Sequence, residues 1–63
     1  MIVVDYIDYG FRWLFVFPDR ESFYSWANEQ RGADLVVPSS WTLDEWIELR
    51  LPLYRKFFGE PPI

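Results

Sequence analysis

Two largely apolar runs separated by a short polar segment, within the first 17 residues, predict a β-hairpin. Two runs, 2–7 and 11–17, are rich in the β-branched and aromatic residues that favour strands. Asp8-Tyr9-Gly10 lies between them, and Gly10 can adopt the positive φ that a three-residue loop with a bulge requires. We therefore expect residues 8–10 to form the turn of the hairpin.

The register of this hairpin decides which side chains share a face of the sheet. The three-residue loop gathers these odd-numbered residues on one face: Val3, Asp5, Ile7, Phe11, Trp13 and Phe15. A two-residue Tyr9-Gly10 loop would shift the pairing by one residue, so each strand residue would share its face with the other set of residues on the partner strand. This loop is less favourable, because Tyr9 would need a positive φ. In either register both faces are largely apolar. Helices could cover both faces, or they could cover one and leave an apolar hairpin face exposed for a partner.

A helix and a short third strand are expected next. Asp19 is a favourable helix N-cap directly after the strand-ending Pro18, and Gly32 is suited to close the helix. Apolar residues between them recur at helical spacing. The segment 34–37 is rich in β-branched and aliphatic residues and predicts a short strand that Pro38 ends.

The last third of the chain predicts a second helix with a clear beginning. Thr42 and Glu45 have the spacing of a capping box, and Trp41 stands where it can pack against Trp46 as a hydrophobic staple. Apolar residues then continue on one face as far as Phe58. Pro52 lies inside this run, so we expect a kink or a break into two short helices.

The element order is therefore β-β-α-β-α. This order predicts a single α+β domain over residues 1–63, in which a three-stranded sheet packs with two helices. If the third strand is parallel to the second, the crossover through the first helix is expected to be right-handed.

The composition argues against catalysis and against a bound cofactor or metal. The chain has no His and no Cys, so disulfides are excluded and a zinc site would need carboxylates alone. A serine nucleophile would have to use Lys56, the only lysine, as its base. Asp5 and Asp8 are three residues apart on an expected strand, so their carboxylates should point to opposite faces. Aromatic residues make up 22% of the chain and should supply most of the core.

The charge of −4 bears on the choice of partner. Nucleic-acid binders usually carry the opposite sign, because contacts with phosphates need Lys and Arg. An acidic chain instead suits a protein partner with a basic surface, where carboxylates can imitate phosphates. The first residues lack the basic region of a secretory signal, and no apolar run approaches the length of a membrane span. We therefore expect a cytoplasmic protein that binds neither membranes nor nucleic acid directly.

The aromatic strand 10–17 allows a different interpretation. It resembles the strand of RNA-recognition motifs whose rings stack on bases, although the order β-β-α-β-α does not give that fold. A single-stranded nucleic-acid binder using Phe11, Trp13 and Phe15 is thus a third hypothesis, which the acidic charge opposes. We expect instead that Trp13, Phe15 and Phe17 pack under the helices as core residues.

These observations favour a small acidic binding protein that is not an enzyme. The preferred hypothesis is an inhibitor or antitoxin-like protein that blocks a partner, for example a phage-encoded inhibitor of a nucleic-acid-handling enzyme. The alternative is a structural or assembly subunit that forms a homodimer, or joins a complex, through the apolar hairpin face. The candidate residues for partner binding are Asp5, Tyr6, Asp8, Tyr9, Arg12, Leu14, Asp44, Glu45 and Glu48.

Overall fold

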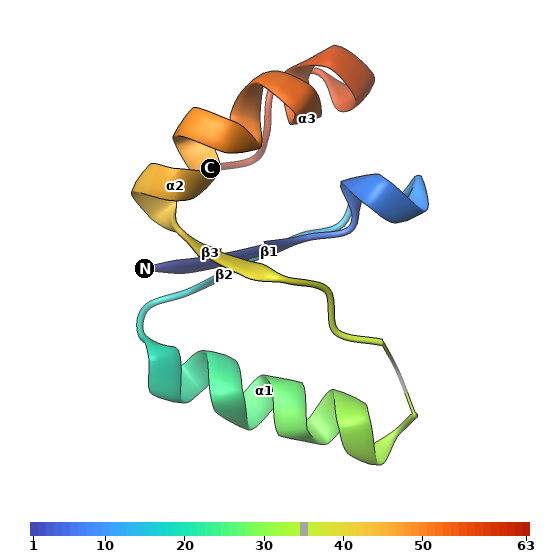
Figure 1. The fold of residues 1–63 in the computed structure, drawn as a ribbon, viewed down its shortest axis with the longest axis vertical. Coiled ribbons are helices and arrows are strands. Elements are labelled where there is room, and N and C mark those ends of the chain that lie inside the picture. The colour runs from blue at the N-terminus through green and yellow to red at the C-terminus, as the bar shows by residue number, and fades with distance from the viewer. Residues whose placement is uncertain (35) are drawn as a thin grey trace.

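A computed structural model describes residues 1–34 and 36–63 and has the expected α+β class. Its elements, coloured along the chain in Figure 1, are β1 (Ile2–Asp5), the 3₁₀ turn η1 (Ile7–Tyr9), β2 (Leu14–Phe17), α1 (Arg20–Gly32), β3 (Ser40–Thr42), α2 (Leu43–Leu49) and α3 (Leu51–Phe58). The three strands form one sheet in the order β2-β1-β3, and β1 is antiparallel to both neighbours. The first strand is therefore the central one.

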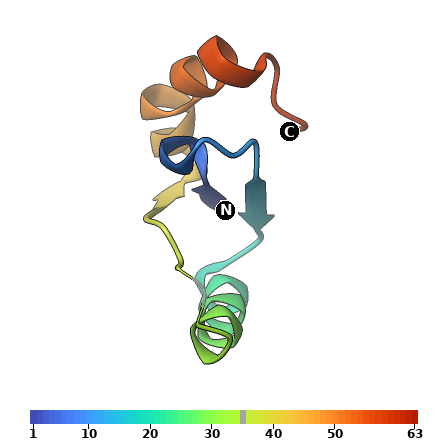
Figure 2. The same cartoon turned by 90° about the vertical axis from the view of Figure 1, so that its right-hand side faces the viewer.

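The sheet is the middle of three layers. Figure 1 shows α2 and α3 on one side of the strands and α1 on the other, and Figure 2 shows the same layering after a quarter turn. Of the two arrangements that the sequence left open, the structure has helices on both faces, so no hairpin face is left fully exposed for a partner. Val3 and Val4, which point to opposite faces of β1, are both fully buried.

The hairpin differs from the expected three-residue loop. Val4 pairs with Phe15 and Asp5 with Leu14, which is the register of the two-residue loop. The strands nevertheless end early, and residues 6–13 form a longer connection. Hydrogen bonds from the Tyr9 and Gly10 N–H groups to the carbonyls of Tyr6 and Ile7 close the 3₁₀ turn η1. This turn buries Ile7 in the core and uses the positive φ of Gly10, which the sequence did predict.

The third strand lies later in the chain than expected. Residues 34, 36 and 37 are not in a strand, and residue 35 lies outside the described residues. Residues 40–42 form β3 instead, and Trp41 pairs with Val3. Trp41 packs against the core cluster that contains Trp46, as the predicted staple requires. Burial of this indole provides a larger apolar contact than the aliphatic residues before Pro38 could make.

The predicted helix starts and the break near Pro52 are confirmed, whereas Gly32 is the last residue of α1 and Ala33, not Gly32, is its C-cap. The Asp19 carboxylate accepts a hydrogen bond from the Ser22 N–H at 2.8 Å and caps α1. Thr42 and Glu45 form both hydrogen bonds of a capping box at the start of α2. The expected break occurs at Arg50, so one predicted helix becomes α2 and α3. Pro52 lies in the first turn of α3, where a missing N–H costs little.

Two apolar clusters lie on the two faces of the sheet. On the side of α2 and α3, a core of Val3, Ile7, Trp46 and Tyr54 is almost completely buried. On the side of α1, Trp26 contacts the rings of Phe15 and Phe17, with centroids 5.2 and 5.3 Å apart. No helix in the described part of the chain is long and apolar enough to cross a membrane.

Candidate protein-binding surface

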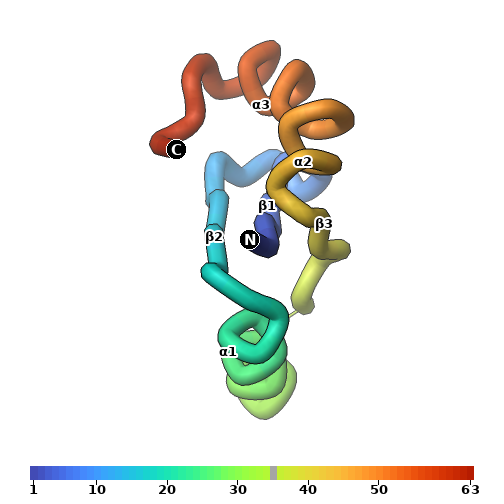
Figure 3. The backbone as a smooth tube through the Cα atoms, turned by 90° about the vertical axis from the view of Figure 1, so that its left-hand side faces the viewer, coloured from blue at the N-terminus to red at the C-terminus, as the bar shows by residue number. Residues whose placement is uncertain are grey.

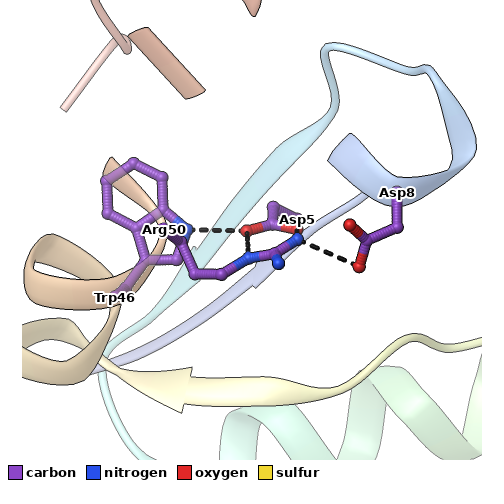
Figure 4. Close-up of polar contacts among 4 residues, drawn as sticks. All are labelled: Asp5, Asp8, Trp46 and Arg50. Carbon is purple, nitrogen blue, oxygen red and sulfur yellow. Dashed lines mark hydrogen bonds and ion pairs between the residues drawn. The ribbon is translucent and has the colours of Figure 1, made fainter. Parts of the chain in front are cut away.

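A buried ion pair lies at the end of β1. The side chain of Asp5 is 1% exposed, and one carboxylate oxygen accepts hydrogen bonds from Trp46 Nε1 at 2.8 Å and Arg50 Nε at 3.1 Å. Its other oxygen accepts a bond from Arg50 Nη2 at 2.8 Å, which completes a bidentate fork (Figure 4). The hydrogen bonds and charge of Asp5 raise the pKa of Arg50 above its ordinary value, against the opposing effect of burial.

The same guanidinium holds the connection between β1 and β2. Arg50 Nη2 also donates to the exposed carboxylate of Asp8 at 3.2 Å, and so joins η1 to the junction of α2 and α3 (Figure 4). The prediction that Asp5 and Asp8 do not converge is therefore wrong, because Asp8 lies in a 3₁₀ turn rather than in a strand. The prediction that Asp5 binds a partner does not fit the structure either, because Asp5 is buried and both of its carboxylate oxygens accept hydrogen bonds within the fold.

Residues 6–13 also present a group of aromatic rings. We use the name aromatic surface for the residues that line a shallow depression of about 240 Å³: Tyr6, Tyr9, Phe11, Trp13 and Val36. The rings of Phe11 and Trp13 stack with centroids 4.7 Å apart and planes 12° apart. Tyr6 meets Trp13 edge to face at 5.4 Å, so the rings support one another in a fixed arrangement.

The exposure of Trp13 differs from the expectation. Trp13 was predicted as a core residue, but it is 55% exposed, and Tyr9 and Phe11 are exposed to a similar degree. The reason is the register, which places Trp13 beside Tyr6 beyond the end of β2. Trp26 of α1 contacts the rings of Phe15 and Phe17, and these two residues show the packing expected of them, although Phe15 remains 38% exposed.

Tyr6 forms the floor of the aromatic surface. Its hydroxyl donates a long hydrogen bond of 3.4 Å to the carbonyl of Val36, which belongs to the segment between α1 and β3. Burial, and secondarily the neighbouring Tyr9, raise the pKa of Tyr6 above its ordinary value of 10.0. Tyr6 therefore stays neutral at physiological pH, while the three more exposed rings are available for contact.

The structure separates the remaining candidates into different environments. Arg12 is exposed on the connection that carries the aromatic surface, but Leu14 packs against the core on the side of α2 and α3. The acidic candidates Asp44, Glu45 and Glu48 are exposed on α2. This helix begins beside Met1, at the opposite end of β1 from η1 (Figure 1). Asp44 and Glu45, in the first turn of α2, therefore lie at the far end of β1 from the connection that carries the aromatic surface.

Glu45 also has a structural role. Its carboxylate accepts hydrogen bonds from the N–H and the hydroxyl of Thr42, and these bonds lower its pKa below the ordinary value of 4.5. Partner binding through Glu45 would compete with the capping of α2.

Sequence reasoning did not include Phe11 and Trp13 among the candidates for protein binding, although both are exposed, and it missed Arg50 and Trp46 as partners of Asp5. One signal was present: Asp5 is a lone charge inside the apolar run 2–7, and buried carboxylates need partners. Chemically, the aromatic surface can stack, exclude water and donate hydrogen bonds from Tyr9 and Trp13. Among the described residues, no group of His, Cys, Asp or Glu could hold a metal ion.

No family model, curated protein or solved structure matches this chain. The case for a function therefore depends on the aromatic surface, the way it is anchored and the charge of the chain.

Proposed function

We propose that this chain is a non-enzymatic binding protein whose aromatic surface docks on a partner protein and blocks it. The observation that carries the proposal is the exposure of three aromatic side chains, Tyr9, Phe11 and Trp13, on a connection that Arg50 anchors to the fold. Aromatic residues are the most frequent anchors of protein interfaces, because each buries a large area at a small cost in side-chain entropy.

The charge supports a partner of particular chemistry. With a net charge of −4, the chain should be drawn to a basic protein surface, such as the nucleic-acid groove of an enzyme in the cytoplasm. In this proposal the aromatic rings supply affinity and the carboxylates accelerate association. Asp44 and Glu45 lie at the opposite end of β1 from η1, so they contribute a long-range field rather than contacts within the same patch.

The experiment is partner capture from a lysate of the source cell with three tagged proteins: wild type, Trp13→Ala and Tyr24→Ala. Tyr24 is the matched control, because it is an aromatic residue of α1 with the same 55% exposure as Trp13. We expect wild type and Tyr24→Ala to retain the same stoichiometric partner. The dissociation constant of Trp13→Ala for that partner should be at least roughly thirtyfold higher. Circular dichroism should confirm that both variants are folded.

One result would overturn the docking proposal, and a second would overturn only its electrostatic part. One is equal retention of every protein by all three tagged chains, which would remove the aromatic surface from the interaction. The other concerns charge: the association rate with the captured partner should fall as salt rises from low to physiological concentration. An unchanged rate would remove the role of the carboxylates and leave only aromatic docking.

A further inference from the structure

The outer edge of β2 has unpaired backbone groups. Tyr6 N–H donates to the Trp13 carbonyl at 3.1 Å, which makes Tyr6 and Trp13 a hydrogen-bonded pair of the antiparallel ladder. Such pairs alternate along a ladder, so Phe15 and Phe17 also direct their N–H and C=O groups toward β1. Leu14 and Val16 must then direct theirs away from the sheet.

In the described part of the chain nothing covers this edge. Figure 3 shows β2 at the margin of the sheet with no other element beside it on its outer side, and Figure 2 agrees from the opposite direction. No backbone hydrogen bond between described residues uses the N–H or C=O of Leu14 or Val16 outside the ladder. The side chains of Phe15 and Val16 are 38% and 39% exposed along the same edge.

The two edges of the sheet differ in their protection. The β3 edge is only three residues long, and the outward N–H of Thr42 is occupied by the carboxylate of Glu45. The β2 edge, Leu14–Phe17, contains no charge and no proline, although these are the usual devices that prevent edge pairing. The sheet is therefore open to extension on the side of β2.

We infer that this edge binds a second copy of the chain, by antiparallel pairing of β2 with β2 about a two-fold axis through Phe15. The six-stranded sheet that results goes beyond the proposed function, because it uses the backbone edge of β2 and shares only Trp13 with the aromatic surface. A second copy fits because the strand is complementary to itself in this register. Leu14 lies opposite Val16 of the other copy, Phe15 opposite Phe15, and Trp13 opposite Phe17, so every cross-strand pair is apolar.

Charges at the two ends of the strand agree with this register. Arg12 precedes β2 and Asp19 follows it, and both are exposed. Antiparallel pairing about Phe15 brings Arg12 of one copy to within one position of Asp19 of the other copy, on both sides of the axis. Parallel pairing would instead place like charges together. In this register the outward N–H and C=O groups of Leu14 bond to those of Val16 in the other copy, and the reverse pair forms by symmetry. No backbone group is then left unpaired in the centre of the new sheet.

The first test is sedimentation equilibrium of wild type, Val16→Pro and Val16→Thr. Proline removes the outward N–H of Val16 while leaving the ladder to β1 intact, whereas threonine keeps both the N–H and the β-branched shape. We expect wild type and Val16→Thr to form dimers. The dissociation constant of Val16→Pro should be roughly thirtyfold higher, because the symmetric pair loses two hydrogen bonds. A wild-type monomer at all concentrations would overturn the inference, as would a series of open oligomers.

The second test remains informative if Val16→Pro fails to fold. The chain has no cysteine, so Phe15→Cys introduces a single thiol that lies opposite its own copy in a non-hydrogen-bonded pair. Mild oxidation should convert Phe15→Cys into a disulfide-linked dimer, while the exposed control Tyr24→Cys should link much less. Equal linking of both variants would contradict the register. Since two acidic chains repel, salt should not weaken this dimer, which distinguishes it from the basic partner of the proposed function.

Discussion

At the scale of single residues, Asp5 connects the central strand to the helices of one layer. It carries a charge in the central strand, between two layers of helices, and it tolerates burial because Trp46 and Arg50 satisfy both of its oxygens. A buried ion pair adds little net stability compared with an apolar pair of the same size, but the loss of one partner leaves an uncompensated charge. This asymmetry makes the pair a strict requirement for the native arrangement.

Removal of Arg50 should therefore be much more damaging than removal of another arginine. We expect Arg50→Met to lower the free energy of unfolding by about 3–5 kcal/mol, because Asp5 stays buried without a counter-ion. The matched control is Arg55→Met, which breaks the exposed ion pair with Glu60 and should cost less than about 1 kcal/mol. Urea unfolding followed by tryptophan fluorescence measures both variants.

A double variant separates charge from packing at this site. Asp5→Asn in the Arg50→Met background keeps an acceptor for Trp46 but removes the unpaired charge, so it should recover part of the lost stability. If Arg50→Met and Arg55→Met cost the same, the buried charge is not what stabilises the fold.

The exposure of Trp13 has an equally direct spectroscopic consequence. Trp46 is 1% exposed and Trp13 is 55% exposed, so Trp13 should contribute most of the long-wavelength tryptophan emission that acrylamide quenches. We expect Trp13→Phe to shift the emission maximum to shorter wavelength and to reduce quenching. Trp46→Phe is the opposite control and should leave the quenched fraction larger than in wild type. A Trp13→Phe spectrum identical to that of wild type would contradict the exposed position of the ring.

At the scale of elements, the ends of the helices were predictable because their signals are local. Asp19, Thr42 and Glu45 cap nearby N–H groups, and Pro52 restricts residues next to it, so the required interactions lie within a few residues. The strands were less predictable. Pairing depends on burial against distant segments, and the choice of 40–42 over 34–37 for the third strand was decided by Trp41, whose contacts are tertiary.

The caps also predict a response of stability to acid. Hydrogen bonds with Ser22 lower the pKa of Asp19 below its ordinary value of 3.8, and bonds with Thr42 do the same for Glu45 relative to 4.5. Because both pKa values are lower in the folded state, their stabilisation is present above the ordinary values and is lost as the pH falls through the folded values. The free energy of unfolding should therefore decrease below about pH 4.5.

Asp19→Asn tests this assignment, since asparagine caps a helix about as well as aspartate but does not titrate. We expect Asp19→Asn to show a shallower decrease in stability with acid and nearly unchanged stability at pH 7. Glu29→Gln is the control, because Glu29 is exposed in α1 and its side chain caps no helix. Identical acid curves for wild type and Asp19→Asn would assign the acid sensitivity to other carboxylates.

At the scale of the whole molecule, the class and the element types followed from the sequence, but the layering did not. Both faces of the hairpin are apolar, so the pattern was compatible with helices on one side or on both, and only the structure distinguishes them. The candidate site was only partly predictable. Tyr6, Asp8, Tyr9 and Arg12 do lie on the connection 6–13, whereas the exposure of Trp13 depends on where α1 ends its contact with the sheet.

The central position of β1 has a consequence for the synthesis of the protein on the ribosome. This strand emerges early, yet one of its neighbours, β3, and the counter-ion of Asp5 come from residues 40–42 and 50. A nascent chain that ends before residue 40 can form only the β1–β2 hairpin and α1, and it lacks β3 and the helices that cover the other face of the sheet. The native packing of β1 must then wait until residues 40–50 have been translated. The strand that is translated first is therefore among the last to gain all of its contacts.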